Sequence, residues 1–275
     1  MAEETIKQIN VKEVLRQKAP SVAGKIPGFV VNWLARLIHQ EELNEVLRRY
    51  HHLQGVDFMQ QLIRYFDIQL EVVHKERLPQ TGRHIFVSNH PLGGLDGICL
   101  AALIGSHYDK KVKYLVNDIL MHIPNLTSIF VPINKHGAQS KRNVSMLEAA
   151  YASDDQVITF PAGLCSRLIE GRVQDLYWHK SFIKKAIQYQ RDVVPIFFAA
   201  HNSSRFYQIA HWREKLGIRM NYEMLLLPDE MFRCKHQSFQ IHIGEPIPWQ
   251  TFDQRQTPLE WAAWIRKTVY NLKNN

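Results

Sequence analysis

Apolar residues in the first 66 positions recur at the three- and four-residue spacing of amphipathic helices. The spacing runs from Phe29 to Ile38 and returns over Leu43–Tyr50 and Met59–Phe66. A charged, amphipathic segment over residues 4–18 is also expected to form a short helix. The pattern therefore predicts a mostly helical N-terminal extension over residues 1–66.

After residue 66 the pattern changes to short runs of β-branched and aromatic residues, most of them separated by helix-length segments. The expected strands are Ile68–Val73, His84–Val87, Lys113–Val116, Ile129–Ile133, Gln156–Phe160, Val193–Phe198 and Phe239–Ile243. A helix is expected over Glu260–Leu272. Alternating strands and helices predict an α/β domain over residues 67–275, with a mixed, mostly parallel sheet flanked by helices.

Composition narrows the kinds of partner and compartment. The 275 residues are 45% hydrophobic and carry a net charge of +8, which favours anionic partners such as phosphate head groups or acidic carriers. The three cysteines are far apart and form no paired motif, so a reducing compartment is expected. The N-terminus lacks the apolar core of a signal peptide, and no apolar run is long enough to span a membrane.

The segment SNHPLGGLDG, residues 88–97, directly follows an expected strand. It contains the candidate catalytic residues His90 and Asp96. Ligands of α/β sheets bind beyond the carboxyl ends of the strands. An imidazole at His90 that is held by a carboxylate at Asp96 could remove a proton from a hydroxyl. Alternatively, Asp96 only caps the next helix and His90 is an ordinary loop residue.

Three later segments share this arrangement of a strand followed by polar or turn residues. They are FVPINK (130–135), ITFPAGLCSR (158–167) and VVPIFF (193–198). In order and spacing, the four segments resemble the four sequence blocks of the glycerolipid acyltransferase family, which includes 1-acylglycerol-3-phosphate acyltransferases. The resemblance covers residues 70–250 and is strongest to the bacterial haemolysin-like and aminolipid O-acyltransferase branch.

Two departures from the family pattern affect what the resemblance implies. The family separates His and Asp by four residues, whereas five lie between His90 and Asp96. A glycine-bearing insertion could bulge out and leave the pair in contact, and the proposed catalytic pair assumes that it does. In the third block, Ala162 stands where the family usually has Glu. Leu164 and Cys165 stand where the family has Thr and a variable residue. This change weakens the case for lysophosphatidic acid as the acceptor and leaves room for a hydroxylated acyl-amino-acid lipid or another lyso-lipid.

The resemblance implies an O-acyltransferase of phospholipid or aminolipid biosynthesis. It would move a fatty acyl group from a thioester of acyl carrier protein or coenzyme A to the hydroxyl of a lyso-lipid. His90 would act as general base and Asp96 would orient it, with no cofactor and no metal. Further residues expected to bind substrate are Asn89, Gly93, Gly94, Lys135, Arg142, Pro161, Gly163, Ser166 and Arg167.

The segment KIPGFVVNWLARLI, residues 25–38, is suited to the surface of a bilayer, with Phe29 and Trp33 entering the head-group boundary. The alternative is an amphipathic helix that packs on the core. Given a lipid substrate, we expect residues 1–66 to contact membrane. The enzyme would then be cytoplasmic and peripheral on the inner face of the cytoplasmic membrane.

Other functions compete with acyl transfer. The same His/Asp pair could activate water in a thioester or lipid hydrolase, or the chain could be a non-enzymatic basic membrane-binding module. Cys165 could suggest a thiol nucleophile, but a packed thiol is favoured. Nucleic acid binding is not expected, because Lys180, Lys184, Lys185 and Arg191 are typical of the solvated face of a helix that buries Phe182, Ile183 and Ile187.

Overall fold

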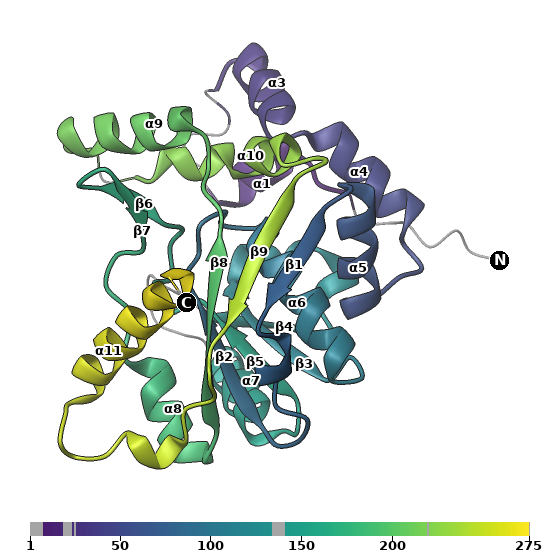
Figure 1. The fold of residues 1–275 in the computed structure, drawn as a ribbon. Coiled ribbons are helices and arrows are strands. Elements are labelled where there is room, and N and C mark those ends of the chain that lie inside the picture. The colour runs from purple at the N-terminus through teal and green to yellow at the C-terminus, as the bar shows by residue number, and fades with distance from the viewer. Residues whose placement is uncertain (1–7, 19–23, 25, 134–140, 219, 275) are drawn as a thin grey trace.

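A central sheet organises residues 8–18, 24, 26–133, 141–218 and 220–274, the part of the chain that the computed structural model describes (Figure 1). Among these residues, seven strands pair in the order β1-β9-β8-β2-β5-β3-β4. They are β1 (Gln69–Val73), β2 (His84–Ser88), β3 (Val112–Asn117), β4 (Phe130–Ile133), β5 (Gln156–Thr159), β8 (Asp192–Ala199) and β9 (Ser238–Ile243). Neighbouring strands are parallel except β8 and β9. The predicted mixed, mostly parallel sheet is confirmed.

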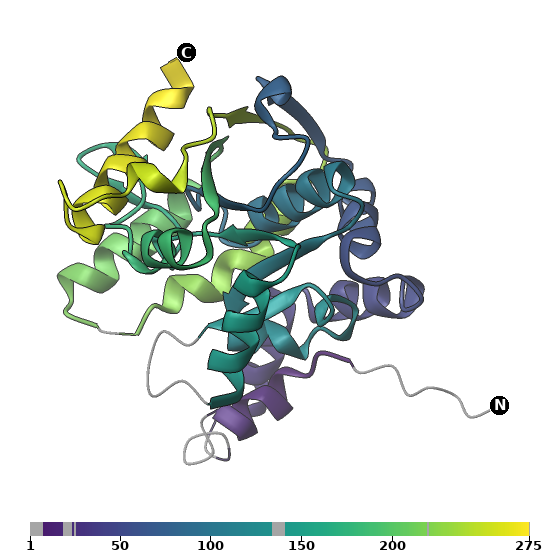
Figure 2. The same ribbon diagram turned by 90° about the horizontal axis from the view of Figure 1, so that it is seen from below.

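Helices cover both faces of this sheet (Figures 1 and 2). The α-helices of the described residues are α1 (Val11–Lys18), α3 (Gly28–Leu37), α4 (Gln40–Arg49), α5 (Gly55–Tyr65), α6 (Leu95–His107), α7 (Lys141–Ala152), α8 (Ser181–Tyr189), α9 (Ser204–Lys215), α10 (Leu227–Arg233) and α11 (Pro258–Asn271), of which α3 and α9 lie beyond the strand ends. Successive residues of a strand point to opposite faces. Phe86 of β2 accordingly lies in the core cluster of α5 and α6, whereas Ile85 and Val87 lie in the cluster of α8 and α11.

Strand β2 places the candidate loop at the centre of the sheet. All five of its residues are buried, as expected for a parallel strand covered by helices on both faces. It pairs with β8 on one side and β5 on the other, in register from Val87 to Pro195 and to Thr159. The residues after Ser88 therefore leave the sheet beside the ends of two other parallel strands.

The N-terminal residues form helices, and the last of these joins the main core. Val56, Phe58 and Met59 of α5 are buried in the same cluster as Leu100 of α6. The helix expected over residues 4–18 begins at Val11, and residues 1–7 lie outside the described residues. The division of the chain at residue 66 stays a prediction.

A two-stranded antiparallel hairpin, β6 (Arg167–Ile169) and β7 (Arg172–Gln174), follows the third sequence block and was not predicted. Within the segment expected to form a solvated helix face, Phe182 and Ile183 are buried as predicted, but Ile187 is exposed. The prediction for Arg191 was also wrong, because its buried guanidinium donates hydrogen bonds to the carbonyls of Tyr151 and Asp155, both at 2.8 Å.

A helix that spans a membrane needs about 20 predominantly apolar residues. Across the described ranges, none combines the length and the apolar content that a membrane span needs.

Candidate active site

The loop between β2 and α6 brings His90 and Asp96 into contact. The imidazole Nδ1 of His90 lies 3.0 Å from Oδ2 of Asp96. The Asp96 side chain has no exposed surface, whereas 14% of the His90 side chain remains exposed. The five intervening residues therefore leave the two side chains paired at the carboxyl end of β2.

The extra loop residue is accommodated by backbone that turns around the Asp96 carboxylate. Its Oδ2 accepts hydrogen bonds from the backbone N–H groups of Leu92 at 2.9 Å and Gly93 at 3.3 Å, and its Oδ1 accepts one from Gly97 at 2.8 Å. Gly93 has a φ of 74°, a left-handed conformation that suits glycine. Since Asp96 also lies in the first turn of α6, it satisfies helix-end donors and pairs with His90 at once.

The contact determines which nitrogen of His90 can act as a base. An ionised carboxylate only accepts hydrogen bonds, so neutral His90 is assigned its ring proton on Nδ1. The lone pair is then on Nε2, to which no residue in the described part of the chain makes a hydrogen bond. The ring is stacked on Phe160 at a centroid distance of 4.0 Å. His90 therefore offers an oriented nitrogen that can accept a proton.

A second buried carboxylate, Asp175, supports the same loop, and sequence reasoning missed it. Its Oδ1 accepts hydrogen bonds from the His90 backbone N–H at 3.2 Å and the Ser166 hydroxyl at 2.6 Å, and its Oδ2 accepts one from the Trp178 indole at 2.8 Å. Burial raises the pKa of Asp175, and the hydrogen bonds to Ser166 and Trp178 partly offset that rise. The only sequence signal was a lone acidic residue among basic and aromatic ones.

The third sequence block lies against the His90 loop. The backbone N–H of Ser166 donates to the His90 carbonyl at 2.8 Å, and the Pro161 carbonyl accepts from the N–H of His179 at 3.0 Å. Gly163 turns with a φ of 68° and donates its N–H to the Phe160 carbonyl at 2.9 Å. Ser166 is thus brought to the His90 loop, with its hydroxyl held by Asp175, whereas these hydrogen bonds of Pro161 and Gly163 stay within their own part of the chain.

Arg167, expected to bind substrate, points into the protein instead of into the loop region. Its guanidinium is buried, lies 2.7 Å from the Glu223 carboxylate and donates to the Cys165 carbonyl at 2.9 Å. Arg213 lies 3.0 Å from the other oxygen of Glu223. The part of Arg167 in substrate binding stays a prediction. Its observed contacts are those of a buried ion pair.

Cys165 lies close to the loop but has the properties of a packed thiol. The side chain is buried, and burial raises its pKa to about 11. A thiol with that pKa is protonated near neutral pH, when only the thiolate is a strong nucleophile. The geometry therefore agrees with the expectation that Cys165 is not the nucleophile.

Asn89 and the glycines of the loop differ in how much of their hydrogen-bonding capacity is already used. The Asn89 amide bridges to β8, donating to the Phe198 carbonyl at 3.0 Å and accepting from its N–H at 2.7 Å. The N–H groups of Gly93 and Gly163 are bonded within their own turns. Gly94 differs, since no described residue accepts a hydrogen bond from its N–H at the start of α6.

The two predicted cationic contacts lie after β4. Arg142 is exposed in the first turn of α7, and no described residue pairs with it. Lys135 lies outside the described residues. Neither side chain is placed against His90 by the structure, so both roles stay predictions.

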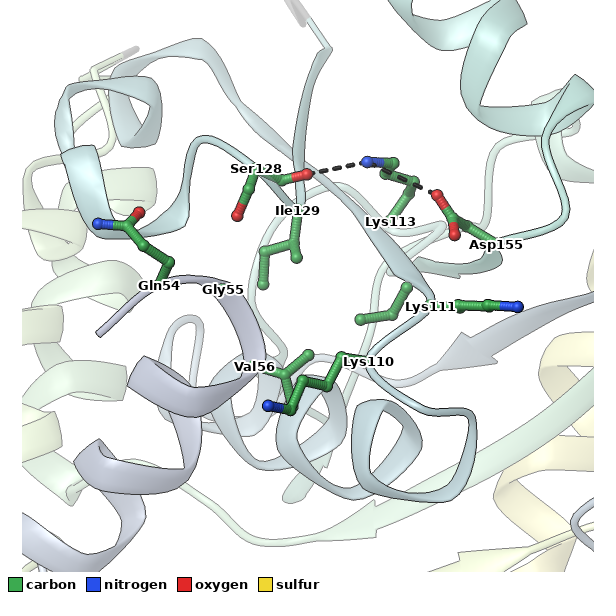
Figure 3. Close-up of a pocket in the computed structure, with 10 residues that line it drawn as sticks. Gln54, Gly55, Val56, Lys110, Lys111, Lys113, Ser128, Ile129 and Asp155 are labelled. Carbon is green, nitrogen blue, oxygen red and sulfur yellow. Dashed lines mark hydrogen bonds and ion pairs between the residues drawn. The ribbon is translucent and has the colours of Figure 1, made fainter. Parts of the chain in front are cut away.

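A separate pocket of about 240 Å³ lies at the opposite edge of the sheet, near the amino ends of β3 and β5 (Figure 3). Its three lysines include Lys110, 2.8 Å from the Asp57 carboxylate, and Lys113, 2.8 Å from the Ser128 carbonyl. Since β2 and its neighbours run away from this edge, the pocket is remote from His90.

Within the described ranges no group of three or more His, Cys, Asp or Glu side chains could hold a metal ion.

Comparison with known proteins gives three findings that cover almost the whole chain. A family model described as acyltransferase matches residues 13–275. Over 272 residues, 99% of the chain, the sequence is 48% identical to the full length of a lyso-glycine lipid O-acyltransferase from Bacteroides thetaiotaomicron. It is 45% identical to a lyso-glycine lipid O-acyltransferase from Phocaeicola vulgatus, over 99% of this chain and 98% of that protein.

Among solved structures, the crystal structure of the 1-acyl-sn-glycerophosphate (LPA) acyltransferase PlsC from Thermotoga maritima is similar with a TM-score of 0.49. The two sequences are 15% identical, and the match covers 96% of this chain and 97% of that one.

Proposed function

Because the chain belongs to the acyltransferase family whose model matches residues 13–275, we propose that it transfers a fatty acyl group to the hydroxyl of a lyso-lipid. The chain is an acyltransferase, and the proposal concerns its acceptor, donor and mechanism. We take the acceptor to be a lyso-glycine lipid, the lipid in the names of two relatives that are 48% and 45% identical over 99% of the chain. This acceptor fits the amino-acid lipid expected from the altered third block.

The observation that carries the proposed mechanism is the 3.0 Å contact between His90 Nδ1 and Asp96 Oδ2, which leaves Nε2 as the basic nitrogen. In the proposed step, Nε2 takes the proton of the acceptor hydroxyl as its oxygen attacks the carbonyl carbon of an acyl thioester. The tetrahedral intermediate collapses, the carbon–sulfur bond breaks, and the thiolate leaves with the proton from His90. Asp96 stabilises the imidazolium that forms between the two proton transfers.

The oxyanion of that intermediate needs hydrogen-bond donors that are free before the substrate arrives. The N–H groups of Gly93 and Gly163 are bonded within the protein, which leaves the N–H of Gly94 as the candidate. Gly94 is the N-cap residue of α6, where the helix dipole also favours negative charge. We assign Gly94 this role as part of the proposal.

The donor is proposed to be a thioester of acyl carrier protein or coenzyme A, and no cofactor enters the mechanism. Thioesters are already activated, so no acyl-enzyme has to form. The net charge of +8 suits either the acidic carrier or the phosphates of coenzyme A. Because the acceptor is a lipid, we also propose that the enzyme acts as a peripheral protein at the inner face of the cytoplasmic membrane.

The experiment that tests this function mixes the purified protein with labelled acyl thioester, with and without lyso-glycine lipid. The proposal predicts a labelled diacyl product only when the acceptor is present. Free labelled fatty acid that forms equally without acceptor would instead indicate a hydrolase using the same His/Asp pair. No turnover with either carrier would leave only a membrane-binding role and refute the proposal.

A further inference from the structure

Helix α9 presents a row of apolar side chains to solvent. Ile209, Trp212 and the C-cap residue Leu216 follow the helical spacing of three and four residues, so they share one side of the helix. Trp212 is 56% exposed and Leu216 is 69% exposed, and Met220 in the segment after the helix is 63% exposed. Since large exposed apolar patches mark interaction surfaces, this row is a candidate interaction surface.

This row lies on the same side of the protein as the candidate active site. Strand β8, whose end lies next to that of β2, leads directly to α9 at the top of the view in Figure 1. Just before α9, the Asn202 amide donates to the Pro91 carbonyl of the His90 loop at 3.1 Å. The opposite face of α9 buries Phe206 and Tyr207 in one apolar cluster with Cys165. The exposed row therefore lies on the side of α9 that faces away from this cluster.

Helix α3 extends the apolar surface. None of its ten residues is buried, and Phe29 and Trp33 are 76% and 57% exposed. Its last residue, Leu37, packs against the same cluster that contains Phe206 and Tyr207 of α9. Both helices therefore pack on that cluster, and both lie beyond the upper ends of β8 and β9 in Figure 1. We call the exposed side chains Phe29, Trp33, Ile209, Trp212, Leu216 and Met220 the apolar face.

Cations border this face. Arg205 and Lys215 of α9 and Arg36 of α3 are exposed, and the Lys215 ammonium lies 5.1 Å from the centre of the Trp212 ring. Two nearby carboxylates are already neutralised, Glu223 by Arg167 and Arg213, and Asp229 by Arg205 and Arg233. This combination matches an anionic bilayer. The aromatic and aliphatic side chains can enter its acyl region, and its head groups attract the surrounding cations.

We propose that the apolar face docks the enzyme on anionic lipid bilayers and holds the His90 loop next to the lipid from which the acceptor comes. This inference rests on the proposed lipid function and adds the surface through which the enzyme reaches its acceptor. A second copy of the chain is the competing occupant, and the test below separates the two.

The test is flotation with vesicles of phosphatidylcholine alone or mixed with phosphatidylglycerol, in the absence of any substrate. The wild type is expected to float with the mixed vesicles and less with phosphatidylcholine alone. Leu216→Asp and Met220→Asp should each lower the vesicle-bound to free ratio at least about tenfold, because a large side chain leaves the bilayer and a charge replaces it. Leu259→Asp is the matched control, since Leu259 is 51% exposed on α11, away from this face, and its binding should equal the wild type.

Three results would overturn the inference. The first is equal vesicle binding by Leu216→Asp, Met220→Asp and the wild type. The second is equal loss of binding by the Leu259→Asp control. The third is a wild-type dimer in light scattering that Leu216→Asp converts to a monomer, with vesicle binding unchanged, which would assign the face to self-association.

Activity separates failure of the docking proposal from failure of the proposed function. With acceptor in detergent micelles, Leu216→Asp should turn over like the wild type, whereas with acceptor in vesicles it should be slower by the factor lost in binding. Absence of turnover by the wild type in both assays would refute the proposed function and leave the vesicle-binding result standing. Equal vesicle-based rates for the wild type and Leu216→Asp would refute the docking proposal alone.

Discussion

His90 is held from both its ring and its backbone, and this double support defines the site at the scale of single residues. Asp96 accepts from the ring nitrogen at 3.0 Å, and Asp175 accepts from the backbone N–H at 3.2 Å. The first contact affects the tautomer and orientation of the ring, because it involves the imidazole itself. The second affects where the ring lies, because it fixes the backbone from which the side chain projects.

The Asp175→Asn variant tests whether this backbone support matters for turnover. Three donors converge on the Asp175 carboxylate, and an amide has one acceptor oxygen, so a buried donor loses its partner at a cost of about 1–3 kcal/mol. We expect kcat for acyl transfer to fall about tenfold or more while KM for the donor changes little. Steady-state kinetics with circular dichroism spectra would show the effect without loss of fold.

The control is Asp67→Asn, which removes an exposed carboxylate that contacts His236 and makes no hydrogen bond to the His90 loop, all of which the structure describes. It should behave as the wild type. Should Asp175→Asn keep its full kcat, or should KM rise as much as kcat falls, Asp175 would not act through the position of His90.

At the scale of elements, Gly94 and Gly97 at the start of α6 differ in how closely other atoms approach them. A Cβ on Gly97 would lie 2.0 Å from the Tyr114 hydroxyl oxygen, because that buried ring packs directly on the helix backbone. A Cβ on Gly94 would meet no atom within 4 Å. The close approach of Tyr114 therefore explains why the residue after Asp96 is glycine.

Gly97→Ala should destabilise the protein by about 1–3 kcal/mol, since a methyl group is forced into a filled core. Gly94→Ala should change the free energy of unfolding by less than about 1 kcal/mol. Urea unfolding of both variants would measure the difference. Equal stabilities would mean that Tyr114 does not pack against α6 as described.

A buried ion pair joins the segment after α9, which contains Glu223, to Arg167 of the third sequence block. Glu223 has no exposed surface and neutralises Arg167 and Arg213 together. Removing the negative partner of such a group leaves buried positive charge, which costs about 3–5 kcal/mol. Glu223→Gln should therefore lower the midpoint of thermal unfolding by several degrees. An unchanged midpoint in differential scanning calorimetry would show that this ion pair is not formed.

At the scale of the whole molecule, the pattern of strands and helices was predictable because each element carries its own local signal. The seven strands of the sheet lie within a residue or two of the expected segments. The β6–β7 hairpin was missed because three-residue strands are too short for periodicity to reveal. Arg191 was misjudged because its burial depends on carbonyls of the α7–β5 connection, which no pattern around Arg191 encodes.

The site was predictable only where its residues are close in sequence. His90 and Asp96 belong to one ten-residue loop, so their pairing could be expected from the sequence. Asp175 lies 85 residues after His90, and Glu223 lies 56 residues after Arg167, so both contacts exist only in the folded chain. For this reason Arg167 was expected to bind substrate, whereas the structure gives its guanidinium a buried partner.

Stability should depend on pH through His84 at the start of β2. Burial lowers the pKa of His84 below its ordinary value of 6.5, so the unfolded chain binds more protons in this range. This contribution to stability is fully present above pH 6.5 and is lost as the pH falls from 6.5 towards the folded pKa. The slope is at most about 1.4 kcal/mol per pH unit. Thermal unfolding of wild type and His84→Gln should diverge in slope below pH 6.5, and parallel curves would contradict this assignment.

The central claim is that His90 removes the proton from the lipid hydroxyl, and the most direct measurement is the rate of acyl transfer by His90→Ala. General base catalysis contributes about 10²–10⁴-fold, so kcat of this variant should fall by that factor. Its circular dichroism spectrum and unfolding midpoint should stay close to those of the wild type, because the His90 ring is partly exposed and the Asp96 carboxylate keeps its hydrogen bonds from the N–H groups of Leu92 and Gly97. A folded His90→Ala protein that forms diacyl product at nearly the wild-type rate would contradict the account.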